Sequence, residues 1–391
     1  MTEKGNNKLS SKFAMEEEPR AQRESRWQVF WRLLKRNRLA FAGLAIFVAF
    51  FFVALAGLLL TSGTRPSFDP AMVRLQEKFL PPLAQPNLPN LLPEEIPTLG
   101  IYLFGTDDLG RDVFSRMLQG AWVSLTVGFV AVGIAVVIGI VLGGISGYFG
   151  RNPVRIDHIL LATMVSLGCG LLLAGATVAG GAVLVITGTY ILFSLLRKKA
   201  LGRQFASRWL RLLHKNTISI DTLIMRIVDI MLCFPAFFLI LTVVALLPAS
   251  MYNIMAVIGL TSWMGTTRFV RAELLSLREQ DFVTAAKALG VGDWRIIFRH
   301  MIPNAMAPVL VSATIGIASA ILIEAGLSFL GFGVPPPHAT WGNILSDGKR
   351  FIFDAPWLTF IPGFAILIVV LAFNLFGEGL RDILNPKLRE R

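Results

Sequence analysis

The chain has 391 residues, of which 54% are hydrophobic and only 16% charged, and its mean hydropathy is +0.64. Several apolar runs are long enough to cross a bilayer, which excludes a soluble domain and predicts an all-α integral membrane protein. The formal net charge of +12 would suggest nucleic acid in a soluble protein. Here the basic residues cluster beside apolar runs, so they indicate orientation in a membrane, and no nucleic-acid partner is predicted.

Residues 1–38 are predicted to form a cytoplasmic tail that ends in an interfacial helix. Aromatic and aliphatic residues alternate with arginine and lysine from residue 20 to residue 38, a pattern typical of a helix lying on membrane lipid. The alternative is a basic flank that only sets the topology. The first membrane span follows at residues 39–60.

Residues 61–122 are predicted to be an extracytoplasmic segment, because their many prolines forbid long helices. Near its end the segment carries three acids and two arginines, at Asp107, Asp108, Arg111, Asp112 and Arg116. Three carboxylates without a ligand loop are more typical of helix caps and arginine partners than of a cation site, so no metal is predicted.

The second span, residues 123–150, is rich in glycine and small residues, which suits close helix contact. Residues 151–221 then have the character of an inserted unit. The apolar tract 159–196 is too long for one span, and residues 179–181 divide it, which predicts a membrane hairpin. Residues 197–215 carry seven basic residues and no acid, so this loop is expected in the cytoplasm.

The core from residue 222 to residue 380 is predicted to contain the remaining spans, and residues 381–391 a cytoplasmic tail. The expected spans lie at about residues 227–247, 252–264, 307–325 and 358–376. With both termini inside, 29 Lys and Arg residues lie inside and 7 outside, counted from the sequence. This asymmetry favours that orientation and gives eight spans, or six without the hairpin.

Two ionisable residues, Asp229 and Glu324, lie within predicted spans. Charges in a bilayer interior are costly, so they mark either a water-filled translocation path or an internal partner. Asp229 has a candidate partner one turn back in Arg226. Glu324 has no partner visible in the sequence. Both roles stay open for each residue.

A charged passage at residues 278–303, here called the knob, stands between apolar runs. Its first half has a helical apolar face at Phe282, Ala285, Ala286 and Leu289. Gly290 can adopt the left-handed conformation that ends a helix. Asp293 is then expected to cap a second helix, residues 294–301, that ends before Pro303.

No catalytic activity is predicted for this chain. The sequence has no phosphate-binding loop of the Gly-x-x-x-x-Gly-Lys-Ser/Thr type, and its four histidines lack metal-ligand spacing. It also has no nucleophile elbow and no His-Glu-x-x-His helix. No catalytic residue and no cofactor are expected.

The knob resembles the cytoplasmic loop of binding-protein-dependent ABC importer permeases. That loop has the pattern Glu-Ala-Ala, three residues, Gly, nine residues, Ile-x-Leu-Pro. The matching positions are 284–286, Gly290 and 300–303, with the spacing kept throughout. The family's Glu, Ile and Leu are replaced by Thr284, His300 and Ile302.

Further motifs resemble the C-type membrane subunit of dipeptide, oligopeptide and nickel importers. They lie at residues 104–116, 225–231, 327–336, 340–342 and 379–382. The resemblance implies a type I ABC importer permease fold, with about six core membrane helices and an inserted hairpin at residues 152–219. It also implies a multi-pass protein of a prokaryotic inner membrane.

The resemblance also implies partners. These are a paralogous B-type permease subunit, two cytoplasmic ATPase subunits that hydrolyse ATP, and an extracytoplasmic binding protein that delivers di- or oligopeptides. The alternatives are nickel or another small solute as cargo, and a membrane assembly factor or enzyme that retains the permease frame. The residues expected to dock on the ATPase are Asp281, Thr284, Ala285, Ala286, Leu289, Gly290, Asp293, Trp294 and Pro303.

Overall fold

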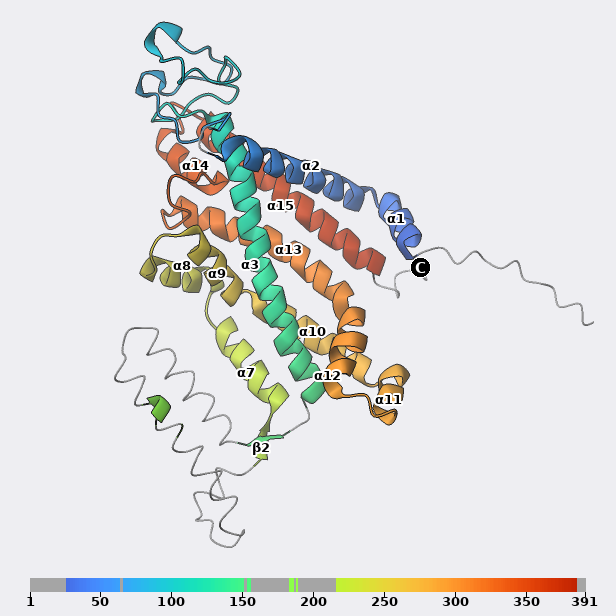
Figure 1. The fold of residues 1–391 in the computed structure, drawn as a ribbon. Helices are drawn as coiled ribbons and strands as arrows, with labels where there is room; N and C mark the ends of the chain where they lie inside the picture. The colour runs from blue at the N-terminus through green and yellow to red at the C-terminus, as the bar shows by residue number, and fades with distance from the viewer. Residues whose placement is uncertain are drawn as a thin grey trace, which may run out of the picture.

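The computed structural model describes residues 26–63, 66–150, 153–155, 183–185, 188 and 216–384. Long apolar helices lie side by side and form the body of the molecule (Figure 1). The predicted hairpin, apart from residues 183–185 and 188, and the predicted basic loop lie outside the described residues. The same holds for the first 25 residues and for the end of the C-terminal tail.

The described elements begin with the helices α1 (Arg26–Arg36), α2 (Arg38–Thr61) and α3 (Val113–Phe149), the strands β1 (Pro153–Arg155) and β2 (Asn216–Ser219), and the helices α7 (Ile220–Leu232), α8 (Ala236–Leu246) and α9 (Met251–Thr261). They continue with α10 (Trp263–Arg278), α11 (Asp281–Ala288), α12 (Asp293–Arg295), the π-helical turn η5 (Ile296–Met301), α13 (Ile302–Phe329), α14 (Trp341–Gly348) and α15 (Trp357–Leu384). The all-α class is confirmed, with one addition: β1 and β2 pair as an antiparallel ribbon.

Four described helices are long and apolar enough to cross a membrane, namely α2, α3, the continuous helix Asp293–Phe329 and α15. Helices α7 and α8 make a fifth candidate if they count as one span, although they are bent by 81°. The bend lies at Pro235, the residue before α8, because proline cannot donate the backbone hydrogen bond that would continue α7.

The span expected at residues 252–264 is broken in the structure. Helix α9 ends at Thr261 and has 11 residues, which is too short to cross a bilayer, and α10 begins after Ser262. The hydroxyl of Ser262 donates to the carbonyl of Ile258 at 2.6 Å, and Thr261 donates to Val257 at 2.7 Å. Such side-chain bonds compete with the helical pattern and favour its interruption.

Helix α3 lies at the centre of the bundle and contacts α2, α9, α10 and α13 (Figure 1). It meets α10 through a row of glycines that includes Gly139, Gly143 and Gly147. A Cβ at Gly143 would lie 2.7 Å from the carbonyl oxygen of Thr267 and 2.8 Å from Cβ of Val270. The close helix contact expected from the glycine content of this segment is therefore present.

The segment before α3 has the irregular structure that its prolines predict. Apart from two isolated β-bridges, described residues 66–112 contain only two 3₁₀ turns, η2 (Leu75–Glu77) and η3 (Leu88–Asn90). At the other end of the bundle, α1 buries Leu34 against Ala40 of α2 and Ile383 of α15. The knob and α14 lie at opposite ends of α13 (Figure 1). The side of the membrane on which each lies remains a prediction.

Candidate functional site

The first helix of the knob, α11, ends as its glycine predicts. Gly290 has a φ of +75°, the left-handed conformation that favours glycine. Its N–H donates to the carbonyl of Lys287 at 3.0 Å, and the N–H of Val291 donates to the carbonyl of Ala286 at 3.1 Å. This pair of bonds is the Schellman ending of a helix, so the predicted turn is confirmed.

The expectation that Asp293 caps the second helix is wrong. Gly292 occupies the cap position, and Asp293 is the first helical residue. The Asp293 carboxylate accepts a hydrogen bond from the Tyr148 hydroxyl at 2.6 Å instead. The ammonium of Lys287 also lies 4.9 Å from the centre of the Tyr148 ring. These contacts tie the knob to the end of α3, because a cation over an aromatic face is attracted to it.

The second helix does not end before Pro303. The π-helical turn η5 follows α12, and the N–H of Ile302 bonds to the carbonyl of Ile297, five residues back. Pro303 then lies within the first turn of α13, where a missing N–H costs little. The wider turn therefore lets one helix run from Asp293 to Phe329.

One side of the knob is buried and the other is exposed. Val283 is fully buried and packs in one cluster with Ile296, Ile297 and Met301. The exposed side presents large apolar side chains at Phe282 (38% exposed), Leu289 (83%), Trp294 (58%) and Phe298 (52%). The indole of Trp294 stacks on the ring of Phe298 at 5.9 Å.

The predicted docking residues follow this division. All are exposed except Ala286, which is partly buried against the packed side of the knob. Val283 anchors α11 and was not among the residues predicted from the sequence. It lies three residues before Ala286 on the same side of the helix, and both pack in the same cluster. The role of each residue in docking remains a prediction.

Asp229 has a different partner from the one expected. Its carboxylate accepts a hydrogen bond from Arg268 of α10 at 2.7 Å, and both side chains are about half-exposed. Arg226, the predicted partner, is also exposed. The pairing joins residues 39 positions apart, so local spacing could not reveal it.

Glu324 is fully buried where α3, α13 and α14 meet. The hydroxyl of Ser328 donates to its carboxylate at 2.7 Å, and that of Ser124 at 3.4 Å. The N–H of Trp341 donates in turn to the Ser124 oxygen at 3.3 Å. Ser328 lies four residues after Glu324 on the same helix, so that partner was visible in principle. Asp229 and Glu324 share no contact among the described residues.

The acids before α3 act as expected. The Asp112 carboxylate caps α3 by accepting from the N–H groups of Phe114 and Ser115 at 3.2 and 3.1 Å. Asp107 is fully buried and accepts from Arg111 at 2.7 Å and from Arg116 at 2.5 Å. The predicted cap and arginine partners are confirmed.

Burial shapes the titration of these acids. It raises the pKa of the Asp108 carboxyl above its ordinary value, and the neighbouring Asp107 and Asp347 carboxylates raise that pKa further. Burial also raises the pKa of the Asp112 carboxyl, against the lowering effect of the hydrogen bonds from Ser115. Carboxylates become harder to ionise when burial removes water or when other carboxylates lie close.

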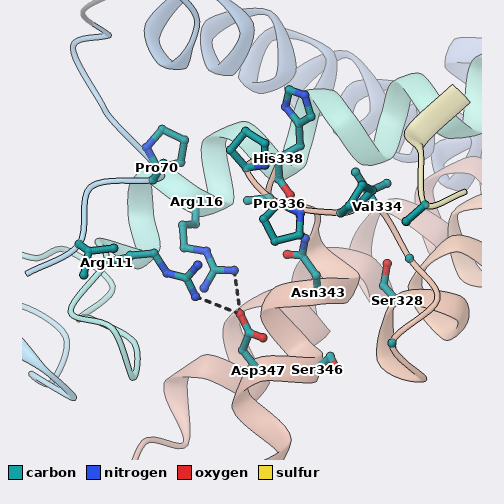
Figure 2. A pocket seen from close by; sticks show the side chains of 18 residues that line it. Pro70, Arg111, Arg116, Ser328, Val334, Pro336, His338, Asn343, Ser346 and Asp347 are labelled. Carbon is teal, nitrogen blue, oxygen red and sulfur yellow. Dashed lines mark hydrogen bonds and ion pairs between the residues drawn. The ribbon is translucent and has the colours of Figure 1, made fainter. Parts of the chain in front are cut away.

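A pocket of about 490 Å³, here called the outer pocket, lies at this end of the bundle. Its lining includes Pro70, Arg111, Arg116, Val334, His338 and Asp347. Arg111 and Arg116 point toward Asp347, and His338 lies on the opposite side (Figure 2). This pocket could not be predicted from the sequence, because its walls come from segments that are far apart in the chain.

Comparison with known proteins places the chain in a family. Residues 214–390 match the profile of the binding-protein-dependent transport system inner membrane component, and residues 25–82 match the N-terminal transmembrane domain of oligopeptide transport permease C. A dipeptide transport system permease protein of Alkalihalophilus pseudofirmus is 36% identical over 365 residues, which cover 93% of this chain and 91% of the relative.

The chain belongs to this family of inner membrane transport permeases. A dipeptide permease of Haemophilus influenzae is 34% identical to it over 93% of this chain and 95% of the relative. An oligopeptide permease of Bacillus subtilis is 30% identical over 94% of this chain and 91% of the relative. The resemblance that the knob and the other motifs indicate is therefore confirmed.

The permease is thus a transport component, and its several apolar helices fit an inner membrane protein. The two family profiles leave residues 83–213 unmatched, whereas the alignment with the Alkalihalophilus protein spans most of the chain. The inserted unit at residues 152–219 remains a prediction.

Proposed function

We propose that this permease is the membrane subunit of an ATP-driven importer of di- or oligopeptides, and that its knob docks on a separate ATPase subunit. A paralogous B-type permease subunit completes the translocation path, and an extracytoplasmic binding protein delivers the peptide. ATP is hydrolysed by the ATPase subunits. Both termini of this permease, like the knob, lie in the cytoplasm.

The observation that carries the docking proposal is the exposed apolar side of the knob. Large apolar patches on a surface mark interaction sites when polar groups surround them. Here Phe282, Leu289 and Trp294 are exposed on a passage whose charges keep it out of the bilayer. The Schellman turn at Gly290 fixes the angle between the two helices, so the patch has a defined shape.

The contacts of the knob with the membrane helices support mechanical coupling. The hydrogen bond from Tyr148 to Asp293 and the buried Val283 join the knob to α3 and α10. A load applied to the exposed side therefore reaches the membrane helices through packed contacts. Asp229 and Glu324 are proposed as path or gating residues.

Peptide as the cargo is supported by the names of the relatives, which include dipeptide and oligopeptide permeases. Nickel or another small solute is the alternative cargo. Uptake of a labelled dipeptide and of ⁶³Ni²⁺ by a strain that lacks the chromosomal copy separates the two. Peptide uptake restored by this gene supports the proposal, and restoration of nickel uptake alone contradicts it.

The docking test removes one exposed side chain. Leu289→Ala leaves the buried side of the knob intact because Leu289 is 83% exposed, and it should lower recovery of the ATPase subunit with the purified permease. Leu246→Ala is the matched control, since Leu246 of α8 is 81% exposed and lies outside the knob. Equal recovery of the ATPase with both variants would contradict the assignment of the knob as the docking site.

Recovery of the ATPase also separates transport from the third hypothesis, an assembly factor or enzyme built on a permease frame. The permease is expressed with its neighbouring genes and purified from the membrane. If no ATPase subunit is ever recovered with it, the transport proposal fails.

A further inference from the structure

We propose that the outer pocket binds the α-ammonium end of a peptide, with the Asp347 carboxylate as its charged partner. This inference rests on the proposed function, because it takes a peptide as the transported solute. It adds a receiving site on the membrane subunit itself, at the end of the bundle opposite the knob.

The first support is the way Asp347 is held. Its Oδ2 atom accepts hydrogen bonds from Arg116 at 2.8 Å and from Arg111 at 3.3 Å. Within the described part of the chain its Oδ1 atom has no hydrogen-bond partner, and the side chain is 38% exposed. The two guanidinium groups therefore fix the carboxylate while one oxygen stays available to a ligand in the pocket (Figure 2).

The second support is the sign of the available charge. The Arg116 side chain is only 4% exposed and that of Arg111 18%, and both also bind the fully buried Asp107. Asp108 lies 3.9 Å from Arg111 and adds a third carboxylate to the two guanidinium groups. The cluster thus keeps an excess of negative charge, which favours a cationic group over the carboxylate end of a peptide.

The third support is the character of the remaining walls. Pro70, Val334 and Pro336 give the pocket an apolar side, which can receive a peptide side chain. Its volume of about 490 Å³ falls within the usual range of small-molecule sites. One charged group and an apolar wall suit the ammonium end of a short peptide.

The experiment compares two probes on the assembled importer in lipid nanodiscs, without binding protein and without ATP. The probes are alanylphenylalanine and its N-acetyl derivative, and equilibrium dialysis measures their affinity. Acetylation removes the ammonium charge and keeps the rest of the peptide. We expect the acetylated probe to bind about tenfold or more weakly, because a charge-assisted hydrogen bond is lost.

Variants assign the effect to Asp347. Asp347→Asn should weaken alanylphenylalanine binding about tenfold and leave the acetylated probe unchanged, and Asp347→Glu should restore part of the loss. Asp354→Asn is the control, since Asp354 is exposed and does not line the pocket. The comparison of the two probes on the unmodified protein stands even if Asp347→Asn does not assemble.

Equal affinity of the two probes for the unmodified importer would overturn the proposal. The proposal would also be overturned if the importer bound no dipeptide and Asp347→Asn lowered its affinity for the binding protein. In that case the pocket would receive a loop of the binding protein. If the ATPase is recovered and uptake is intact while the probes bind alike, only the pocket assignment fails. If no ATPase is recovered, the proposed function itself fails.

Discussion

Arg271 of α10 donates two hydrogen bonds to the carboxylate of Asp221 at the start of α7, and the one from Nη2 to Oδ2 measures 2.6 Å. The hydroxyl of Ser146 on α3 donates to the same carboxylate at 2.5 Å. Three helices therefore meet at one acid. Because α10 leads directly into α11, this acid connects the bent span α7–α8 with the base of the knob.

Arg271→Gln should lower the stability of the permease by about 1–2 kcal/mol, because it removes a two-pronged, charge-assisted contact whose side chains are only 30% and 24% exposed. Arg268→Gln is the matched control on the same helix. Its pair with Asp229 is about half-exposed and should contribute less than about 1 kcal/mol. Thermal unfolding in detergent measures both variants. An equal fall in Tm for the two would contradict this reading.

Gly290→Ala should destabilise the knob by about 1 kcal/mol, because alanine resists the positive φ of this position. Gly292→Ala is a close control: neither glycine has an atom within 4 Å of an added Cβ, and only Gly290 has a positive φ. Recovery of the ATPase and uptake should fall for Gly290→Ala alone. Membrane insertion should be the same for both.

Substitution of Ala286 is a less direct test of docking than these, because Ala286 is partly buried. A bulky replacement there should abolish uptake, as should Gly290→Pro, while membrane insertion is retained. Limited proteolysis of the knob distinguishes lost packing from lost docking. Unimpaired uptake in either variant would count against the coupling role.

Gly143→Ala should cost about 1–3 kcal/mol, since an added methyl group would press on the backbone of Thr267 and on Val270. Gly133→Ala, on the same helix with nothing within 4 Å of its added Cβ, should be neutral or stabilising by up to about 1 kcal/mol. Thermal unfolding of the two variants gives the comparison. The same Tm for both would show that the α3–α10 contact tolerates a larger separation.

Asp108→Asn should raise Tm at pH 7, and the gain should shrink as the pH falls toward 4. The pKa of Asp108 is raised in the folded protein, so the folded state binds the proton more tightly than the unfolded state does. Its contribution to stability is therefore complete below the ordinary pKa of 3.8 and is lost as the pH rises through the raised value. The exposed Asp354→Asn is the control. A gain that grows on acidification would reverse the assigned sign.

Local features of the chain, in the knob and before α3, were predictable from sequence, because they depend on the chemistry of a few neighbouring residues. Gly290 ends α11 as its lack of a Cβ predicts, and the acids near residue 110 cap and pair as their spacing indicates. The predictions are wrong where a contact with a neighbouring helix determines the partner of a side chain. Asp293 bonds Tyr148 rather than its own helix, and Asp229 bonds Arg268 rather than Arg226.

The continuation of the helix past Pro303 could not be predicted from the rule that a proline ends a helix. That rule assumes α-helical bonding on both sides of a proline, whereas η5 shifts the register by one residue just before it. The outer pocket was out of reach for another reason. Asp347 and Arg116 are 231 positions apart, and only the packing of α14 beside α3 brings them together.

The continuous helix Asp293–Phe329 has a mechanical consequence. Its 37 residues correspond to a rod about 55 Å long, with Trp294 of the knob near one end and Ser328 of the outer pocket near the other. If this helix tilts about the point where it crosses α3, its two ends move at the same time and in opposite directions. The π-helical turn η5 and Pro308 are the positions at which this helix can bend.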